Sequence, residues 1–456
     1  MVAPPLSRRE FVRRSALAAA ASAVPFGCGR APEHKPNLLV LCSDQQHWQA
    51  MGFVDEFFDT PNADALALES TVFERAFCAS PQCSPSRSAM LTGFYPHHTR
   101  VMNNEGAVGG PALAMETIGP ALQRGGYHTG YFGKWHLGNE PLGNSGWDER
   151  NTAGVDPATT GRALDFLHRH AQSEKPFALF LMYVDPHDVY AFSPDVPPGA
   201  TATGAPLGES WRRERFEGKP APQEQFMTGD QGRVIWGRAQ PVWEAYREFY
   251  RGKVELYDRH LGSVVRILKA LGLWESTVVL NTSDHGEMDT QHKLVFKGPF
   301  MYEHVVRIPM TVRVPEAFAG VGPQRVADYD WVNVDTVPTL LDLAGLDPPE
   351  CHGRSARAIL TGQGARPSRD YVVGQYFGKQ GWLNPIRMIR TPDWKLNVYI
   401  GHGEELYDLR NDPHELVNLA ADAGRAGRMR ELRAELDAWI RDHADPFDRL
   451  EATPLG

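Results

Sequence analysis

The chain has 456 residues, of which 42% are hydrophobic and 23% charged, and its formal net charge is −9. These values are ordinary for a soluble globular protein with one large domain and a smaller one. The negative balance gives no electrostatic reason to expect nucleic acid as a partner, although a local basic patch for another polyanion stays open.

The first 33 residues read as an export signal and linker rather than as part of the fold. SRREFVRR (7–14) is a twin-arginine pattern, and the small apolar run ALAAAASAV (16–24) follows it. This run is far shorter than the roughly 20 residues that span a bilayer, so we expect no transmembrane span and a periplasmic or extracellular location. Cys28 is a candidate for lipid attachment, although Pro25 and Phe26 fit that motif poorly.

Three continuous apolar runs predict strands that are buried on both faces of a parallel sheet: 37–43, 177–184 and 277–283. Ionisable or metal-binding side chains follow each run at once: Asp44 and Gln45, Asp185 and His187, Asp284 and His285. A shorter strand is predicted within 128–138, ending in Lys134 and His136. Ligands of such sheets bind beyond the carboxyl ends of the strands, which makes these residues candidates for a shared site.

Helical periodicity over 161–171 and 241–271 separates the predicted strands, which favours an α/β domain with helices on both faces of the sheet. A further helix is expected within 330–349, stopped by Gly345. Residues 190–240 are rich in Pro, Gly and Thr and show little periodicity. We interpret them as a long surface insertion of the kind that shapes a binding mouth.

After about residue 365 the pattern changes to short antiparallel strands, followed by a helix over roughly 421–443. The expected fold class is therefore α/β, with a large, mostly parallel sheet between helices and a small C-terminal α+β subdomain. The predicted division is an export segment (1–33), a catalytic domain (34–365) and the C-terminal subdomain (366–456).

The chain has five cysteines, and their odd number and wide spacing do not indicate a disulfide framework. One of them, Cys83, opens the stretch CSPSRSAMLTG (83–93). Pro85 suits the first turn of a helix, so a helix that begins near Ser84 would place Cys83 at its N-terminus and Arg87 one turn later. A helix N-terminus attracts anions, and the planar donors of Arg87 suit a tetrahedral oxyanion. Taken alone, Cys83 is better interpreted as a buried small apolar residue, and only the surrounding pattern favours the nucleophile.

The pattern C-S-P-S-R-x-x-x-L-T-G resembles the signature of the type I sulfatases, which belong to the alkaline phosphatase-like superfamily. The resemblance extends over most of the chain: NLLVLCSDQ, GYHTGYFGKWHLG, DPH, TSDHGEMDTQHKLVFKGPFMYEHVVRIP and ELYDLRNDPHELVNLA. It implies that a formylglycine-generating enzyme oxidises Cys83 to formylglycine. The hydrated aldehyde would then attack sulfur, and its second hydroxyl would expel sulfate.

The resemblance also implies a divalent cation held by Asp44, Gln45, Asp284, His285 and the residue derived from Cys83. Many sulfatases have an Asp-Asp pair where this chain has Asp44-Gln45, and Asn where it has His285. These departures resemble the choline sulfatase and phosphonate monoester hydrolase branch. Calcium is the expected ion, with manganese or magnesium as alternatives, because a nitrogen donor suits a hard cation less well.

Five further positions match catalytic residues of the family: Arg87, Lys134, His136, His187 and Lys297. Lys134 and His136 would contact the diol and the sulfate, while His187 and Lys297 would bind sulfate and assist the leaving oxygen. A histidine can act there as a general acid. One of Asn103 and Asn104 is expected to line the pocket, and the sequence does not choose between them.

The expected function is hydrolysis of a sulfated small molecule or glycan by an exported sulfuric ester hydrolase. Two alternatives stay open: a phosphonate monoester hydrolase or phosphodiesterase on the same scaffold, and a non-catalytic protein that binds sulfated glycans. Residues 139–160 and 190–240 are expected to select the alcohol half of the substrate.

Overall fold

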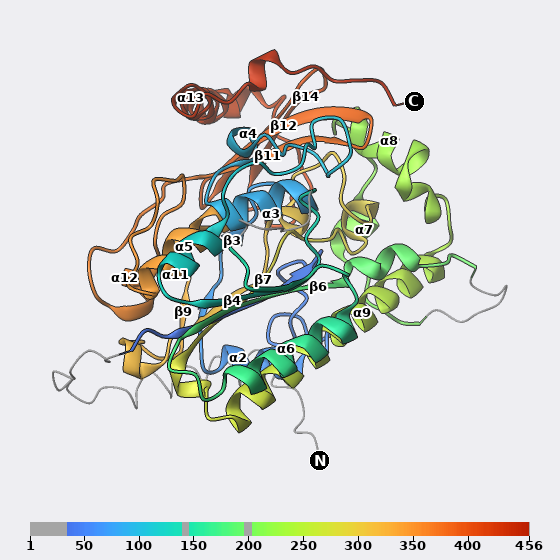
Figure 1. The fold of residues 1–456 in the computed structure, drawn as a ribbon. Coiled ribbons are helices and arrows are strands. Elements are labelled where there is room, and N and C mark those ends of the chain that lie inside the picture. The colour runs from blue at the N-terminus through green and yellow to red at the C-terminus, as the bar shows by residue number, and fades with distance from the viewer. Residues whose placement is uncertain (1–33, 139–145, 196–202, 456) are drawn as a thin grey trace.

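The computed structural model describes residues 34–138, 146–195 and 203–455 (Figure 1). The predicted twin-arginine signal and Cys28 lie outside the described residues. Within the described ranges, no helix combines the length and the apolar character that crossing a membrane requires.

The described part of the chain has a central sheet of eight strands in the order β5-β4-β6-β1-β7-β8-β2-β9. The sheet is mostly parallel, and β8 runs antiparallel to both of its neighbours. Its strands are β1 (Asn37–Asp44), β2 (Thr71–Phe73), β4 (His128–Gly133), β5 (Glu149–Asn151), β6 (Phe177–Pro186), β7 (Thr277–Ser283), β8 (Met310–Arg313) and β9 (Gln324–Val326). The short strands β3 (Ala76–Phe77) and β10 (Trp331–Val332) pair separately.

The three predicted apolar strands form the middle of this sheet. β1 lies between β6 and β7, with Leu39 opposite Leu179 on one side and Val279 on the other. Every residue of β1 and β7 is buried, as expected for strands covered on both faces. β4 ends at Gly133, so Lys134 and His136 stand in the loop that follows the strand and not at its end.

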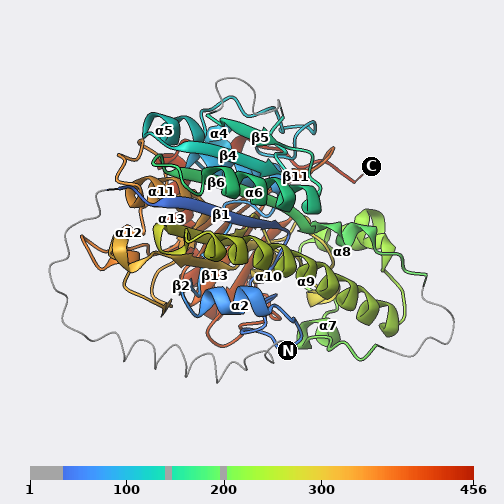
Figure 2. The same cartoon turned by 60° about the horizontal axis from the view of Figure 1, so that its bottom comes forward.

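Helices cover both faces of the sheet, which confirms the predicted layers (Figures 1 and 2). One face carries α2 (Pro61–Ala67), α6 (Asp156–His170) and α9 (Gln240–Ala270). The other carries α3 (Cys83–Thr92), α5 (Ile118–Arg124) and α11 (Thr336–Leu343). α11 ends just before Gly345, whose φ of 66° breaks the helix as expected.

Residues 190–240 contain short helices in their described part: α7 (Glu209–Arg213), α8 (Ala221–Gly229) and a 3-10 turn over Gln231–Val234. The prediction of a surface insertion holds only in part, because Phe226 and Met227 of α8 are fully buried. Phe226 packs edge-to-face against Phe300, with ring centroids 5.4 Å apart. The insertion therefore shares the core of the catalytic domain.

The C-terminal region forms the predicted antiparallel sheet and helix. Its strands are β11 (Val372–Lys379), β12 (Trp382–Arg390), β13 (Trp394–Tyr399) and β14 (Gly403–Asp408), and α13 (Ala426–Asp442) follows. The remaining short helices are α4 (Pro96–Thr99), α10 (Glu303–Val306) and α12 (Arg357–Thr361). The backbone N–H of Gln375 in β11 donates to the carbonyl of Ala79 at 2.8 Å, which docks this sheet beside the start of α3.

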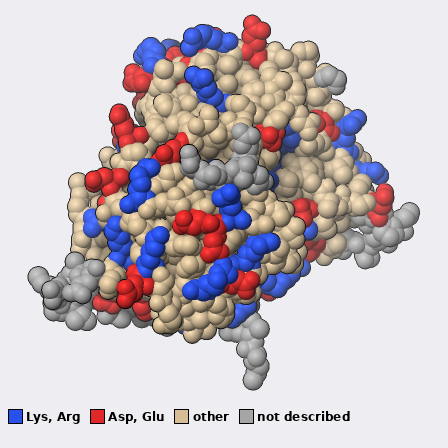
Figure 3. All heavy atoms as spheres, viewed as in Figure 1, with Lys and Arg blue, Asp and Glu red and all other residues tan. Residues whose placement is uncertain are grey.

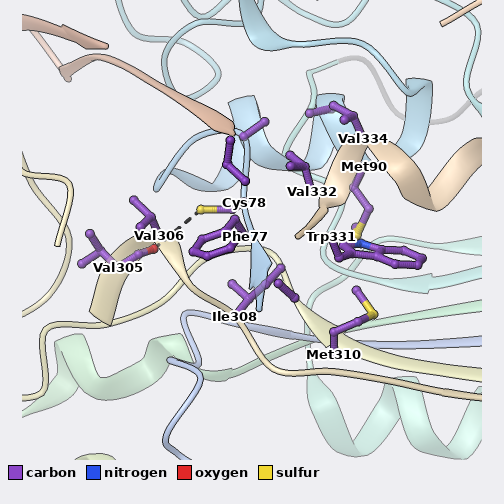
Figure 4. Packing of buried hydrophobic residues seen from close by; sticks show 14 of the residues in the cluster. Phe77, Cys78, Met90, Val305, Val306, Ile308, Met310, Trp331, Val332 and Val334 are labelled. Atoms are coloured by element: carbon purple, nitrogen blue, oxygen red, sulfur yellow. Dashed lines mark hydrogen bonds between the residues drawn. The ribbon is translucent and has the colours of Figure 1, made fainter. Parts of the chain in front are cut away.

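A buried apolar cluster holds α3 against the sheet (Figure 4). Phe77, Met90 and Trp331 are almost completely buried within it, and the Cys78 thiol donates to the carbonyl of Val305 at 3.6 Å. The cysteines of the described residues are all free thiols, in agreement with the absence of a disulfide framework. On the face seen in Figure 3, acidic and basic side chains are intermixed, so that face presents no continuous basic patch.

A titratable contact joins α4 to the segment after α11. The backbone N–H of Tyr95 donates to His352 Nδ1 at 3.1 Å, which requires an unprotonated nitrogen. Burial, together with the nearby imidazoles of His443, His97 and His98, lowers the pKa of His352 to about 3. Protonation of His352 therefore opposes the native contact.

We predict that this contact makes the protein less stable as the pH falls below about 6.5, where the unfolded histidine takes up a proton first. The loss should continue towards pH 3, the folded-state value. His352→Asn keeps an acceptor for Tyr95 but does not titrate, so its melting temperature should fall less between pH 6.5 and 4.5. Thermal unfolding of both proteins at pH 8 gives the baseline, and parallel pH curves would contradict the prediction.

Candidate active site

The nucleophile position lies at the first turn of α3. Gln82 precedes the helix with an extended backbone (φ −144°, ψ 146°), and Cys83 is the first helical residue. Every residue of α3 is buried, and Gly93 ends the helix in the left-handed conformation (φ 79°). The structure therefore places Cys83 at a helix N-terminus, as the sequence predicts.

Arg87 bridges the two aspartates that follow β1 and β7. Its Nε donates to Asp284 Oδ2 at 2.8 Å and an Nη donates to Asp44 Oδ2 at 3.0 Å. The other Nη donates to the carbonyl oxygen of Lys134 at 2.7 Å. All three charged side chains of this bridge are fully buried. Since its donors point at these acceptors, the role of Arg87 towards a substrate oxyanion stays a prediction.

The Cys83 thiol lies among cations in a fully buried position. Its Sγ is 3.2 Å from His285 Nε2 and 3.6 Å from Lys134 Nζ. Burial opposes ionisation of the thiol, but Lys134, Lys297 and His285 outweigh it and bring the pKa of Cys83 well below its ordinary value. The surroundings of residue 83 thus favour a negatively charged group.

Four of the predicted metal ligands converge on one point. The ligand atoms of Asp44, Cys83, Asp284 and His285 lie within 4.8 Å of one another. His285 Nδ1 is 2.9 Å from the carbonyl of Gly286, which can only accept, so Nδ1 carries the proton and Nε2 faces the cluster as a lone pair. Oxygen donors and one imidazole nitrogen therefore fit a divalent cation.

The two aspartates differ in their response to this environment. Burial and Cys83 oppose ionisation of Asp44, yet Lys134, His187 and Arg87 outweigh them and hold its pKa below the usual value. Burial, reinforced by the charge of Asp44, raises the pKa of Asp284. A cation between the two carboxylates would relieve their mutual repulsion.

Gln45 adopts a left-handed backbone (φ 69°), and its backbone N–H donates to Asp284 Oδ1 at 3.1 Å. Its Oε1 accepts from Lys297 Nζ at 2.5 Å, while its Nε2 donates to Glu287. These partners fix the orientation of the amide, since a lysine only donates and a carboxylate only accepts. The predicted residues Gln45 and Lys297 are therefore in direct contact.

The remaining predicted residues surround the same thiol. Lys134 Nζ donates to Asp44 Oδ2 at 2.5 Å. His136 has a left-handed backbone (φ 57°), and its buried Nδ1 has no hydrogen-bond partner. The imidazole of His136 also contributes to lowering the pKa of Cys83. His187 directly follows β6, near enough to Asp44 and Cys83 that both affect the pKa of its imidazole.

The structure separates the two candidate asparagines. Asn104 Oδ1 accepts from the backbone N–H of Ser84 at 3.2 Å, which places it against the first turn of α3. The Asn103 amide instead donates to the carbonyls of Val108 and Gln380, at 2.9 and 3.1 Å. Asn104 is therefore the better candidate for the pocket.

Two residues of this region were not singled out from the sequence. Glu287 is fully buried and accepts from Gln45 and from the Tyr246 hydroxyl, so it orients a predicted ligand. Lys379, at the end of β11, donates to the carbonyl of Lys297 at 2.7 Å. Burial, reinforced by the charge of Lys297, lowers the pKa of Lys379 to about 7. Glu287 lies within a quoted motif, whereas no pattern marked Lys379.

Comparison with known families identifies the family of the chain. The sulfatase family model matches residues 36–346, and a model described as the C-terminal region of N-sulphoglucosamine sulphohydrolase matches residues 291–442. The chain belongs to the sulfatase family. A Delta 4,5-hexuronate-2-O-sulfatase of Bacteroides thetaiotaomicron is 27% identical, and the match covers 93% of each chain. The protein is thus a sulfuric ester hydrolase of the alkaline phosphatase-like superfamily.

Solved structures support the same fold. The structure of a 2-O GAG sulfatase has a TM-score of 0.82 at 25% identity, and the match covers 92% of this chain and 95% of that chain. The phosphonate monoester hydrolase of Agrobacterium radiobacter has a TM-score of 0.72 at 22% identity, with 91% and 97% covered. The second likeness concerns the fold alone.

We predict that Arg87→Met lowers the free energy of unfolding by about 3–5 kcal/mol, because it leaves Asp44 and Asp284 buried without their shared cation. Urea denaturation measures this loss, and added divalent cation should restore part of it. Arg124→Met is the matched control, since Arg124 is 66% exposed and pairs with Glu116 at the surface. Equal stability of the two variants would refute the prediction.

Proposed function

We propose that the protein releases sulfate from sulfated carbohydrates with a formylglycine derived from Cys83 and a bound divalent cation. The observation that carries the proposal is the position of Cys83: a fully buried side chain at a helix N-terminus, facing His285 and Lys134 within 3.2 and 3.6 Å. A purely structural cysteine has no need of a lysine ammonium and a buried imidazole nitrogen beside its thiol.

The residues around Cys83 suit a metal ion, with calcium as the proposed ion and manganese or magnesium as alternatives. Asp44, Asp284, His285 Nε2 and the amide oxygen of Gln45 would hold it, together with the residue derived from Cys83. When bound, the ion supplies Lewis-acid stabilisation of negative charge on the sulfate. The aldehyde hydrate supplies the nucleophilic oxygen at the position of Sγ.

The chain's own side chains position and neutralise the substrate. Lys134 and Lys297 both favour negative charge at residue 83, so a sulfate bound there would meet two positive charges. Burial and the charge of Lys297 lower the pKa of His187. A bound sulfate opposes these cations and so favours protonated His187, which then donates to the leaving oxygen.

The proposed substrate class rests on the relatives. The curated relatives include an N-acetylglucosamine-6-O-sulfatase and an endo-4-O-sulfatase of Bacteroides thetaiotaomicron, 25% and 26% identical to this chain. Together with the twin-arginine pattern, they support an exported enzyme that acts on glycans in the periplasm or outside the cell. Its maturation would require a formylglycine-generating enzyme, and Cys28 remains a proposed site of lipid attachment.

A phosphonate monoester hydrolase or phosphodiesterase is the second candidate, because Gln45 and His285 lower the negative charge of the metal site. Comparison of kcat/KM on aryl sulfate and aryl phosphonate esters separates the two functions. Dominance of the phosphonate ester would displace the sulfatase assignment.

We predict that Cys83→Ala abolishes sulfate release while the protein still folds, because alanine keeps the buried position but supplies no nucleophile. Sulfate release from defined sulfated glycans is measured against wild type coexpressed with a maturation enzyme. Mass spectrometry of the peptide over residues 80–100 should find formylglycine at position 83 in the active protein. Desulfation that persists in Cys83→Ala would refute the proposal.

We predict that His187→Ala slows hydrolysis of alkyl sulfates by about 10²- to 10⁴-fold but affects p-nitrophenyl sulfate far less. The reason is that a nitrophenolate leaves without protonation, whereas an alkoxide does not. Steady-state kcat on both esters measures the difference. An equal loss on both substrates would show that His187 binds sulfate without donating a proton.

A further inference from the structure

Two histidines and a glutamate gather at the amino-terminal edge of the sheet, away from Cys83. His128 is the first residue of β4, Glu149 the first residue of β5, and His170 the last residue of α6. β4 lies between β5 and β6, and α6 packs against β4 (Figures 1 and 2). Lys134 follows the opposite end of β4, so at roughly 3.3 Å per residue this cluster is about 20 Å from the active site.

The three side chains present nitrogen and oxygen atoms to one another. His128 Nε2 and His170 Nε2 lie 3.2 and 3.1 Å from the same oxygen, Glu149 Oε1. The two imidazole rings are 4.1 Å apart at an angle of 31°, so they lie side by side. In a tetrahedral zinc site, bonds of about 2.0–2.2 Å place neighbouring ligand atoms about 3.3–3.5 Å apart. The two nitrogen–oxygen distances are within a few tenths of an ångström of this value, and all three ligand atoms lie within 4.8 Å of one another.

Two charged neighbours contact Glu149 and His128, in the way that residues behind the ligands of a metal site orient those ligands. Arg169 pairs with Glu149 Oε2, which leaves Oε1 to the two histidines. Asp148 Oδ2 lies 3.6 Å from His128 Nδ1, and it is held in place by the backbone N–H of Thr129 at 2.8 Å. Without a metal, His128 Nε2 donates to Glu149; when an ion displaces that proton, the carboxylate beside Nδ1 favours the tautomer whose Nε2 lone pair binds the metal.

We propose that His128, Glu149 and His170 bind a transition-metal ion, zinc or a related N-binding cation, at a site independent of the sulfatase centre. The side chains are 24%, 29% and 17% exposed, which gives an ion access from solvent and leaves room for a water as fourth ligand. Imidazole donors discriminate against calcium and magnesium, which prefer oxygen ligands.

The bound ion would tie an edge strand to the body of the sheet. β5 has only three residues and pairs with β4 alone. The metal would join β5 to β4 and to the end of α6, and binding to the native state alone raises stability by mass action.

The test measures zinc bound per chain after removal of all metal with a chelator. Isothermal titration and elemental analysis are carried out with excess calcium, on wild type and on His128→Gln, His170→Gln and Glu149→Gln. We expect each variant to lose one zinc equivalent per chain and the zinc-dependent rise in melting temperature. Cobalt-loaded wild type should show the visible absorption of a tetrahedral site, and the variants should lack it.

His168→Gln is the matched control, because His168 is exposed on the same helix and outside the cluster. Glu149→Gln keeps an acceptor for both imidazoles, so it separates metal binding from hydrogen bonding alone. Melting temperatures of the metal-free proteins verify that the variants fold. Equal zinc and cobalt binding by wild type and the three variants would overturn the proposal, as would wild type that binds no zinc at this cluster.

Discussion

The buried guanidinium of Arg87 is the interaction on which the rest of the site depends. It connects α3 with Asp44 at the end of β1, with Asp284 directly after β7, and with the loop after β4. Burial of charge is costly unless every partner is satisfied, and here one planar cation serves three acceptors. Because the acceptors come from segments far apart in the chain, this one side chain fixes the position of Cys83 relative to its neighbours.

The C-terminal subdomain also supports the site around Cys83. Lys379 donates from β11 to the backbone of Lys297, which in turn holds Gln45. Asn333 connects the other side, since its amide donates to the Ser86 hydroxyl at 2.7 Å and its oxygen accepts from the N–H of Ala79 at 2.9 Å. The first turn of α3, which carries Cys83, is therefore held in place by segments that come much later in the sequence.

The apolar runs of β1, β6 and β7 could be predicted because strands buried on both faces leave a strong local pattern. The shared location of the polar residues that follow them could be predicted for the same reason, since carboxyl ends of parallel strands share one edge. Their role as metal ligands came from the family resemblance and stays a prediction. The contact of Lys379 with this site could not be predicted, because a single lysine at the end of an antiparallel strand forms no recognisable sequence pattern. The packing of Phe226 was missed as well, since short helices in a Pro- and Gly-rich stretch show too few turns to reveal a period.

His128, Glu149 and His170 illustrate a further limit of the sequence. These residues are separated by 21 positions in each step, and only the pairing of β4 with β5 and the return of α6 bring them together. No short sequence motif predicts such a cluster, because its residues come together only through the topology of the fold.

Because Cys83 is completely buried, its side chain is open to enzymatic modification only before folding is complete. Oxidation to formylglycine, as proposed, would require an enzyme to enclose this side chain in its own active site, so that enzyme would have to act on an unfolded or partly folded chain. The proposed maturation would then compete kinetically with collapse around α3. Variants that fold faster would be expected to emerge with a larger unconverted fraction, even when their final structure is unchanged.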